Sequence, residues 1–200
     1  VHSFHRTKTI TSGEGGFLLI DNKKIFKRAK HLRDLGRSAI DPYIATEVSL
    51  KYMPSNFQAS LVNAQLNRIN ELLKIKKKIF NEFKKVLKKN KIEFVSNFSN
   101  EYIVNGYWAT TIVYDRKYKI KSGDLIKILE KKGIPARKFF APLVKQNAYK
   151  KFHIKNEKFP VAEILYDYGL TLPCHYNLTK KQMIYIAQNL SDILNSNLSE

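Results

Sequence analysis

The residue of this chain with the clearest chemical potential is a lysine in a short polar loop. Lys8 lies within Ser3-Phe4-His5-Arg6-Thr7-Lys8-Thr9-Ile10-Thr11-Ser12-Gly13-Glu14-Gly15-Gly16. Positive charge from His5 and Arg6, together with partial burial, would lower the pKa of a lysine and leave more neutral amine to attack an aldehyde. Ser3 can donate a hydrogen bond to a phosphate, loop amides can bind the same group, and the glycines allow close backbone approach.

Taken alone, these residue types leave three interpretations open. The loop fits a lysine nucleophile, a phosphate-binding loop or an ordinary turn. It is not a Walker A loop, because no Gly-Lys-Ser/Thr follows a glycine at the required spacing.

A strand and a helix are expected to position this loop. The apolar run Phe17–Ile20 predicts a short buried strand. Asp21 or Asn22 can cap the helix that follows. This helix is expected to run to about Leu35 and to end at Gly36.

A long helix is expected after a loop over residues 37–55. Ser55 or Asn56 can cap it. Its apolar residues recur near helical spacing: Phe57, Leu61, Leu66, Ile69, Leu73, Ile79, Phe83 and Val86. Its outer face is expected to carry Lys74, Lys76, Lys77, Lys78, Lys84, Lys85, Lys88 and Lys89. Such a run is usually a solvated helix face.

Short strands and helices alternate beyond residue 90. We expect strands over 107–114, 134–140 and 170–172, a helix over 124–132 closed by Gly133, a helix from Pro160 to Gly169, and a last helix capped by Thr179. The inner face of the last helix is expected to carry Met183, Ala187, Leu190 and Leu194. This alternation predicts an α/β or α+β fold. A domain boundary is expected within the long helix, near residues 75–95.

The formal net charge of +19 favours anionic partners such as nucleic acid, acidic membrane surfaces or phosphorylated small molecules. Abundant lysine, isoleucine and asparagine also fit a genome-wide compositional habit, so a dedicated nucleic-acid role is not favoured. No apolar run approaches the roughly 20 residues that span a bilayer. The first residues contain neither Met nor a signal region, which predicts a fragment of a longer chain.

The single cysteine, Cys174, excludes an internal disulfide and a cysteine-based metal site, and we predict no metal. A reducing, cytoplasmic location fits this cysteine content. His175 follows Cys174, but neighbouring residues on a strand face opposite ways. We therefore expect a thiol without a catalytic role.

Four motifs in order resemble those of the DegT/DnrJ/StrS sugar aminotransferases. The first is Ser3-Phe4-His5-x-x-Lys8 with Thr11-Ser12-Gly13-Glu14-Gly15-Gly16. The second is Tyr52-Met53-Pro54-Ser55-Asn56-Phe57-Gln58-Ala59 with Ala64-Gln65-Leu66. The third is Gly133-Ile134-Pro135-Ala136-Arg137-Lys138-Phe139-Phe140-Ala141-Pro142-Leu143, and the fourth joins Pro160–Glu163, Gly169–Pro173 and Leu178-Thr179. They cover nearly the whole chain.

The resemblance implies site residues and a cofactor, pyridoxal 5′-phosphate (PLP). Lys8 matches the lysine that carries PLP and later moves a proton between cofactor and substrate carbons. Ser3 matches a serine that binds the cofactor phosphate. Lys51 matches a residue that reaches the phosphate bound by the partner subunit, and a lysine there is typical of the perosamine-synthase-like branch. Arg137 is a candidate for the nucleotide-sugar site, with a structural role on a strand as the equal alternative.

The resemblance also implies the fold, an aspartate aminotransferase-like α/β architecture. Residues 1–85 would be the C-terminal part of the PLP-binding large domain with the long connecting helix, and residues 86–200 the small C-terminal α/β domain. The family's N-terminal half, with its carboxylate that pairs with the ring nitrogen, would be absent. We therefore expect the 200 residues to be inactive alone. Met53-Pro54 and Val144 depart from the usual pattern, which bears on the identity of the substrate.

The implied function is PLP-dependent transfer of an amino group, with glutamate as donor, to a keto-sugar nucleotide in amino-sugar or surface-polysaccharide biosynthesis. The implied assembly is a cytoplasmic homodimer with shared active sites and no membrane association. The first alternative is a PLP-dependent sugar dehydratase of the same family, although relatives of that kind carry histidine in place of the lysine. The second is a basic nucleic-acid-binding module that uses the lysine-rich helix.

Overall fold

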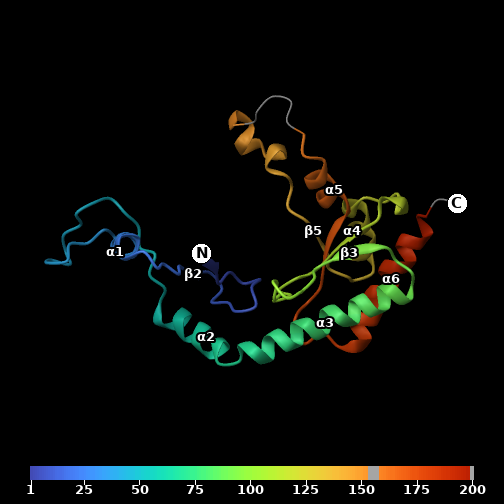
Figure 1. The fold of residues 1–200 in the computed structure, drawn as a ribbon, viewed down its shortest axis with the longest axis horizontal. Helices are drawn as coiled ribbons and strands as arrows, with labels where there is room; N and C mark the ends of the chain where they lie inside the picture. The colour runs from blue at the N-terminus through green and yellow to red at the C-terminus, as the bar shows by residue number, and fades with distance from the viewer. Residues whose placement is uncertain (153–157, 199–200) are drawn as a thin grey trace. The chain divides into compact units, whose positions relative to one another are not determined.

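The computed structural model describes residues 1–152 and 158–198, and the chain divides into two compact units (Figure 1). Unit 1 is Val1–Asn70 and unit 2 is Glu71–Glu200. The domain assignment made from the sequence, 1–85 and 86–200, stays a prediction. Among the described residues, every helix is too short or too polar to span a membrane.

Unit 1 begins with a small antiparallel sheet. Strand β1 (His2–Ser3) pairs with β2 (Gly16–Phe17), with His2 opposite Phe17. The expected buried strand over 17–20 is therefore wrong in length and in burial. Leu18 and Leu19 are 52% and 74% exposed, because β2 pairs with β1 alone in its sheet and no second layer of unit 1 buries the run.

Helix α1 (Lys23–Leu32) begins as expected and ends early. The side chain of Asn22 caps it by accepting hydrogen bonds from two backbone N–H groups of the first turn, at 2.9 and 3.1 Å. The helix stops at Leu32 rather than near Leu35, because the backbone N–H of Leu35 donates to the carbonyl of Leu50 and the chain turns back. Gly36, at φ +58°, lies in that turn and not at the helix end.

The single long helix expected from the sequence is two helices, α2 (Asn56–Leu66) and α3 (Ile69–Lys89). Ser55 caps α2 in a capping box with Gln58, as expected. The break follows Gln65, whose carbonyl accepts from the N–H of Arg68 three residues on, a tighter bond than that of an α-helix. The sequence pattern did not reveal this change of hydrogen bonding.

Unit 2 is built on a four-stranded antiparallel sheet in the order β3-β4-β6-β5. The strands are β3 (Phe94–Ser96), β4 (Thr110–Tyr114), β5 (Arg137–Lys138) and β6 (Gly169–Leu172). The helices after α3 are α4 (Ser122–Lys131), α5 (Pro160–Tyr168) and α6 (Lys180–Ser196), with short 3-10 turns η1 (Arg116–Tyr118), η2 (Leu143–Lys145) and η3 (Asn147–Phe152). The expected starts of α5 and α6 at Pro160 and Thr179 are confirmed.

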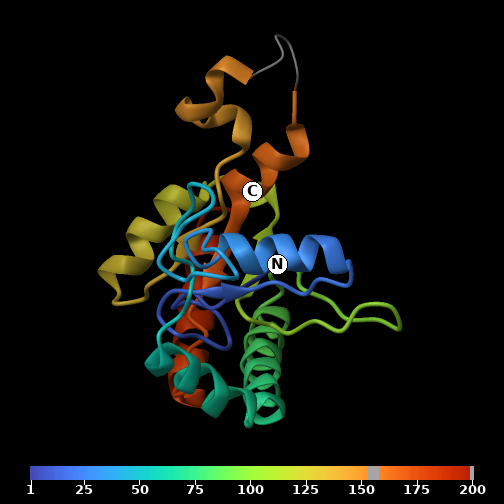
Figure 2. The same cartoon turned by 90° about the vertical axis from the view of Figure 1, so that its left-hand side faces the viewer.

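One face of this sheet packs on helices to form the core of unit 2. Along β4, Thr110, Ile112 and Tyr114 are buried while the residues between them are half-buried, as the two-residue period of a strand requires. Helices α3 and α6 lie side by side in both views (Figures 1 and 2) and contribute to the same cluster. The expected inner face of α6, Met183, Ala187, Leu190 and Leu194, is confirmed as buried.

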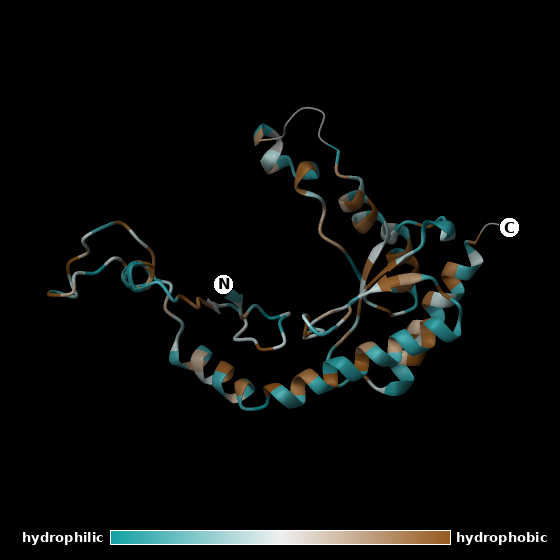
Figure 3. Cartoon of the chain, in the orientation of Figure 1, coloured by the Kyte–Doolittle hydropathy of each residue, from teal (hydrophilic) through white to brown (hydrophobic). Residues whose placement is uncertain are grey.

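Lys76 is a correction to the expected outer face of α3. Its side chain is only 6% exposed, and Nζ donates to the carbonyl of Cys174 at 2.5 Å and lies 4.5 Å from the centre of the Tyr176 ring. Position 76 falls between Leu72 and Ile79 on the buried stripe of α3. Helical spacing therefore places Lys76 on the buried face of α3. Figure 3 shows polar and apolar segments alternating along this helix.

Candidate active site

The loop around Lys8 is closed by backbone hydrogen bonds. The N–H of Phe4 donates to the carbonyl of Gly15 at 2.8 Å, and the N–H of Ser12 donates to the carbonyl of Phe4 at 3.0 Å. Lys8 itself is half-buried, and its N–H donates to the carbonyl of His5 at 2.9 Å, which closes a tight turn. The candidate lysine therefore stands on an ordered turn.

Glycines are required where the loop passes closest to itself. Gly15 has φ +141°, and a Cβ there would meet the Ser12 hydroxyl at 2.9 Å. A Cβ on Gly16 would meet the backbone carbonyl of His2 at 2.5 Å. Ser12 is buried and donates its hydroxyl to the carbonyl of Glu14 at 2.8 Å. The Gly-Glu-Gly-Gly run thus shapes the return of the loop onto β1.

Two glutamines of α2 hold the loop from outside. Gln65 accepts the N–H of Thr11 at 3.0 Å and donates its amide to the carbonyl of the same residue at 2.7 Å. Gln58 donates to the carbonyl of Glu14 at 3.2 Å. Sequence reasoning quoted both glutamines within the second motif but gave them no role. Their spacing of seven residues, which puts them on one helix face, was the available signal.

Ser3 lies on β1, five residues before Lys8, and is exposed. Its Oγ accepts the N–H of His5 at 3.1 Å. That bond uses an acceptor lone pair and leaves the hydroxyl hydrogen able to donate. The geometry is therefore compatible with the predicted phosphate contact.

Lys51 lies on a separate segment of unit 1. Its Nζ forms an exposed ion pair with Asp34, and the backbones of the two residues form an antiparallel bridge. The hydrogen bond from Lys51 holds the pKa of Asp34 below its ordinary value. Within unit 1 this cation is thus engaged by Asp34, and its predicted role toward a partner's phosphate stays a prediction.

Arg137 belongs to unit 2. It lies on β5 opposite Thr171 of β6, and its side chain is exposed. Both interpretations made from the sequence, a nucleotide-sugar contact and a structural role on the strand, remain predictions.

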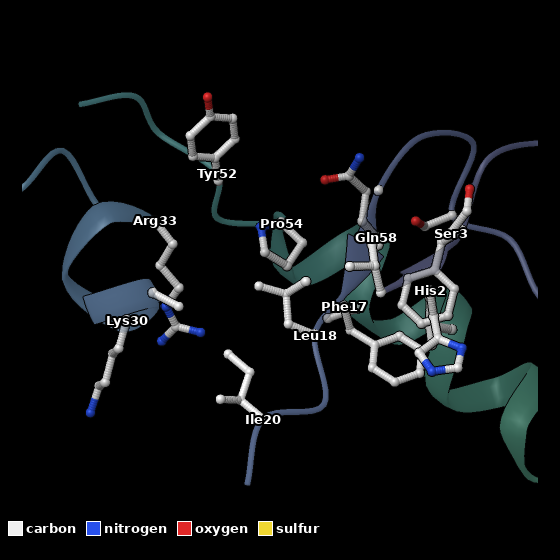
Figure 4. A pocket seen from close by; sticks show the side chains of 18 of the residues that line it. His2, Ser3, Phe17, Leu18, Ile20, Lys30, Arg33, Tyr52, Pro54 and Gln58 are labelled. Carbon is white, nitrogen blue, oxygen red and sulfur yellow. The ribbon is translucent and has the colours of Figure 1, made fainter. Parts of the chain in front are cut away.

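An apolar hollow of about 1000 Å³ lies beside Ser3 in unit 1 (Figure 4). The rings of His2 and Phe17 stack in its wall, with centroids 4.4 Å apart. Ser3 and Gln58 belong to the lining, but Lys8 does not. The lining also includes Phe4, Leu18, Ile20, Phe26, Lys30, Arg33, Tyr52, Pro54, Val62 and Leu66. This hollow is therefore adjacent to the candidate phosphate contact rather than centred on the lysine.

Among the described residues, no three His, Cys, Asp or Glu side chains gather in a way that could hold a metal ion. Within unit 1, Lys8 and Ser3 belong to one segment, whose arms are joined by backbone hydrogen bonds.

The chain matches known proteins over nearly its whole length. GDP-perosamine synthase of Escherichia coli O157:H7 is 28% identical over 190 residues, which cover 95% of this chain and 50% of that protein. Among solved structures, Helicobacter pylori PseC, an aminotransferase involved in the biosynthesis of pseudoaminic acid, aligns with a TM-score of 0.85 at 21% identity, over 96% of this chain and 52% of that one. The PLP form of Spr1654 from Streptococcus pneumoniae aligns with a TM-score of 0.83 at 23% identity, over 98% and 52%.

These structures share the fold, which confirms the expected aminotransferase architecture. The chain spans about half the length of the relatives that it matches. The family model described as the DegT/DnrJ/EryC1/StrS aminotransferase family matches residues 1–191. This chain is a member of that family.

Proposed function

We propose that the protein takes part in PLP-dependent transfer of an amino group to a nucleotide-linked keto-sugar, with Lys8 as the residue that carries the cofactor. The observation that carries this proposal is the position of Lys8 in the first family motif, on a turn closed by its own N–H and the carbonyl of His5. The family match over residues 1–191 supports it.

The residues around Lys8 fit PLP in kind. An amine on an ordered turn suits covalent attachment to an aldehyde, and the Ser3 hydroxyl can donate to a phosphate. Gly15 and Gly16 leave the loop without side chains where it closes. PLP, when bound, supplies an electron sink for carbon–hydrogen bond cleavage. In that setting the Lys8 amine would move the proton, Ser3 would hold the phosphate, and Lys51 would reach the phosphate in a partner subunit.

The substrate class follows from what the relatives are named for. The E. coli relative is a GDP-perosamine synthase, and PseC acts in pseudoaminic acid biosynthesis. For this protein we propose a nucleotide-linked keto-sugar as the amino acceptor and glutamate as the amino donor, in amino-sugar or surface-polysaccharide biosynthesis. A net charge of +19 suits an anionic nucleotide, and Arg137 is our candidate contact to it.

The catalytic assembly would be a cytoplasmic homodimer that includes more polypeptide than these 200 residues. The relatives are about twice as long as the match, and the apolar run after β2 is exposed in unit 1. The 200 residues alone are therefore expected to be inactive.

The two alternative functions have less support. A sugar dehydratase of this family would be expected to carry histidine where this chain has Lys8. A nucleic-acid-binding module would rest on the lysine-rich face of α3, but one of those lysines, Lys76, is buried, and the similar proteins are named for sugar chemistry.

The test is borohydride reduction after PLP is added, followed by peptide mapping, in the chain and in the complete polypeptide that carries it. We expect the reduced label on Lys8 and its loss in Lys8→Ala. Lys181→Ala, on the exposed side of α6, is the matched control and should keep the label. Full transaminase activity with a keto-sugar nucleotide in the Lys8→Ala enzyme would refute the proposal, and product analysis would separate amino transfer from dehydration.

A further inference from the structure

Gln65 is half-buried and uses both atoms of its amide in hydrogen bonds. Its Oε1 accepts the N–H of Thr11 at 3.0 Å, and its Nε2 donates to the carbonyl of Thr11 at 2.7 Å and to that of Leu61 at 2.7 Å. Both amide hydrogens are thus used, and the reverse orientation of the amide would set donor against donor. The side chain therefore links Thr11 to α2 in one fixed orientation.

Thr11 is the residue where the two arms of the loop meet. Its hydroxyl donates to the carbonyl of Phe4 at 2.9 Å and accepts the N–H of Gly13 at 2.9 Å. Phe4 follows Ser3, the candidate phosphate contact, and Thr11 follows Lys8 by three residues. A bond that fixes Thr11 consequently constrains both arms at once.

Gln58 makes a second link between α2 and the loop. Its Oε1 accepts the backbone N–H of Ser55 at 2.9 Å in the capping box, while its Nε2 donates to the carbonyl of Glu14 at 3.2 Å. Gln58 and Gln65 lie two turns apart on one face of α2. The helix therefore holds the loop at Thr11 and at Glu14, on the segment that follows Lys8.

We infer that Gln65, supported by Gln58, is a positioning residue that fixes the Lys8 amine relative to the Ser3 hydroxyl. This inference rests on the proposed function of Lys8. Reactive groups must be held within about 0.5 Å of their productive geometry. Unit 1 has almost no apolar core that could hold these groups in place, so the hydrogen bonds from α2 must position them. Residues of the second family motif thereby position the loop formed by the first.

The test uses substitutions that change single hydrogen bonds. Gln65→Glu keeps the acceptor for the N–H of Thr11 and loses the amide donors to Thr11 and Leu61, whereas Gln65→Met removes all three bonds at similar length. Gln58→Glu keeps the capping box and loses the donor to Glu14. The matched control is Gln182→Glu, because Gln182 holds the same capping-box position on α6 in unit 2.

Three quantities are measured in the complete polypeptide: the share of reduced PLP label on Lys8 relative to the other lysines, the pH dependence of that share, and hydrogen exchange at the Thr11 amide. We expect the Lys8 share to fall by about tenfold in Gln65→Glu, which loses two hydrogen bonds, and by at least as much in Gln65→Met, which loses three. We also expect the midpoint of its pH dependence to move and the Thr11 amide to exchange faster. Gln58→Glu should show smaller changes and Gln182→Glu none.

A purely structural role would alter exchange without moving the pH midpoint of labelling. Low pH should restore one of the lost bonds in Gln65→Glu, because the carboxyl can donate to the carbonyl of Thr11 once it is protonated, below about pH 4. Hydrogen exchange at the Thr11 amide reads this recovery. Protection of Thr11 should then partly return in this variant and not in Gln65→Met.

The outcomes separate the inference from the function on which it rests. Selective labelling of Lys8 that persists unchanged in both Gln65 variants overturns the inference and leaves the proposed function in place. Absence of selective labelling in the unaltered protein overturns the proposed function and the inference together. Selective labelling that is lost in the Gln65 variants and kept in Gln182→Glu establishes the positioning role.

Discussion

Unit 1 and unit 2 differ in how much apolar surface they bury. Among the described residues of unit 1, Val62 is the one buried apolar side chain, and α1 buries none at all. The described part of unit 2 instead encloses a cluster of twenty buried residues drawn from α3, α4, α6, the sheet and the segments between them, with Leu125, Leu190 and Leu194 completely buried. The candidate catalytic residues lie in the unit with little apolar core, and the unit with the large core carries only the candidate substrate contact Arg137.

This difference teaches how the two halves should respond to change. A net intramolecular hydrogen bond contributes about 0.5–1.5 kcal/mol, while burial of a leucine side chain contributes about 1.5–3 kcal/mol. The Lys8 loop depends on a small number of hydrogen bonds, so it should open locally at low free-energy cost. Binding loops and active-site segments are commonly drawn from such regions. Unit 2 should behave as one cooperative block.

The largest expected effect is a core truncation in unit 2. Leu190→Ala should lower the free energy of unfolding by about 2–5 kcal/mol, because it leaves a cavity in a filled core. Leu19→Ala, at a side chain that is 74% exposed in unit 1, should change it by no more than about 0.5 kcal/mol. Urea unfolding, followed by the fluorescence of Trp108, measures both. Equal losses of unfolding free energy in the two variants would contradict the proposed difference between the units.

The next effect is a difference in local opening between the units. Amides of the Lys8 loop should exchange with solvent faster than amides of β4 and α6, because opening the loop breaks few bonds and exposes little apolar surface. Hydrogen exchange read by mass spectrometry at neutral pH gives the order directly. Loop amides that exchange only with global unfolding would mean that unit 1 is held as firmly as the core. Loss of this protection difference on addition of PLP would show that the cofactor orders the loop.

The contrast between the units also explains what the sequence could predict. Helix caps are local, so residue types alone predicted Thr179 and narrowed the other two caps to adjacent pairs, of which Asn22 and Ser55 are the observed members. The inner face of α6 was found because its apolar period is regular. Burial of the run after β2 was predicted wrongly, because burial depends on a second layer that unit 1 does not provide.

Long-range effects account for the remaining errors. Lys76 was placed outside because its residue type outweighed its position on the apolar stripe of α3. The break between α2 and α3 was missed because it has no proline or glycine to mark it. In the candidate site, Lys8 and Ser3 could be named from a motif. The bonds from Gln58 and Gln65 could not, since they join residues 44 and 54 positions apart.

A smaller effect is expected from the two capping boxes. Thr179→Ala removes the cap of α6, which packs in the core, and should lower the free energy of unfolding of unit 2 by about 1 kcal/mol. Ser55→Ala removes the equivalent cap of α2 and should leave that unfolding transition in place while it speeds exchange in the first turn of α2, where the N–H of Gln58 loses its acceptor. Denaturant titration and hydrogen exchange together check the pair. A shift of the unit 2 transition by Ser55→Ala would show that the units unfold as one.

The smallest expected effect is electrostatic and depends on pH. Asp167 accepts a hydrogen bond from Lys121 at a distance of 2.8 Å, which holds the pKa of its carboxyl below the ordinary value. Because the folded pKa is depressed, the ion pair stabilises unit 2 above the unfolded pKa of about 3.9 and stops doing so as pH falls through the lower, folded value. Asp167→Asn should therefore be slightly less stable than the unaltered protein at pH 7, with a stability difference that closes toward pH 3 and shrinks in added salt.

Asp34→Asn removes the comparable pair with Lys51 in unit 1 and should leave the unit 2 transition unchanged at every pH. Trp108 fluorescence in urea at a series of pH values measures both variants. A gap for Asp167→Asn that is the same at pH 3 and pH 7 would mean that packing of the side chain, and not its charge, sets its contribution. The contrast between the units would then rest on apolar burial alone.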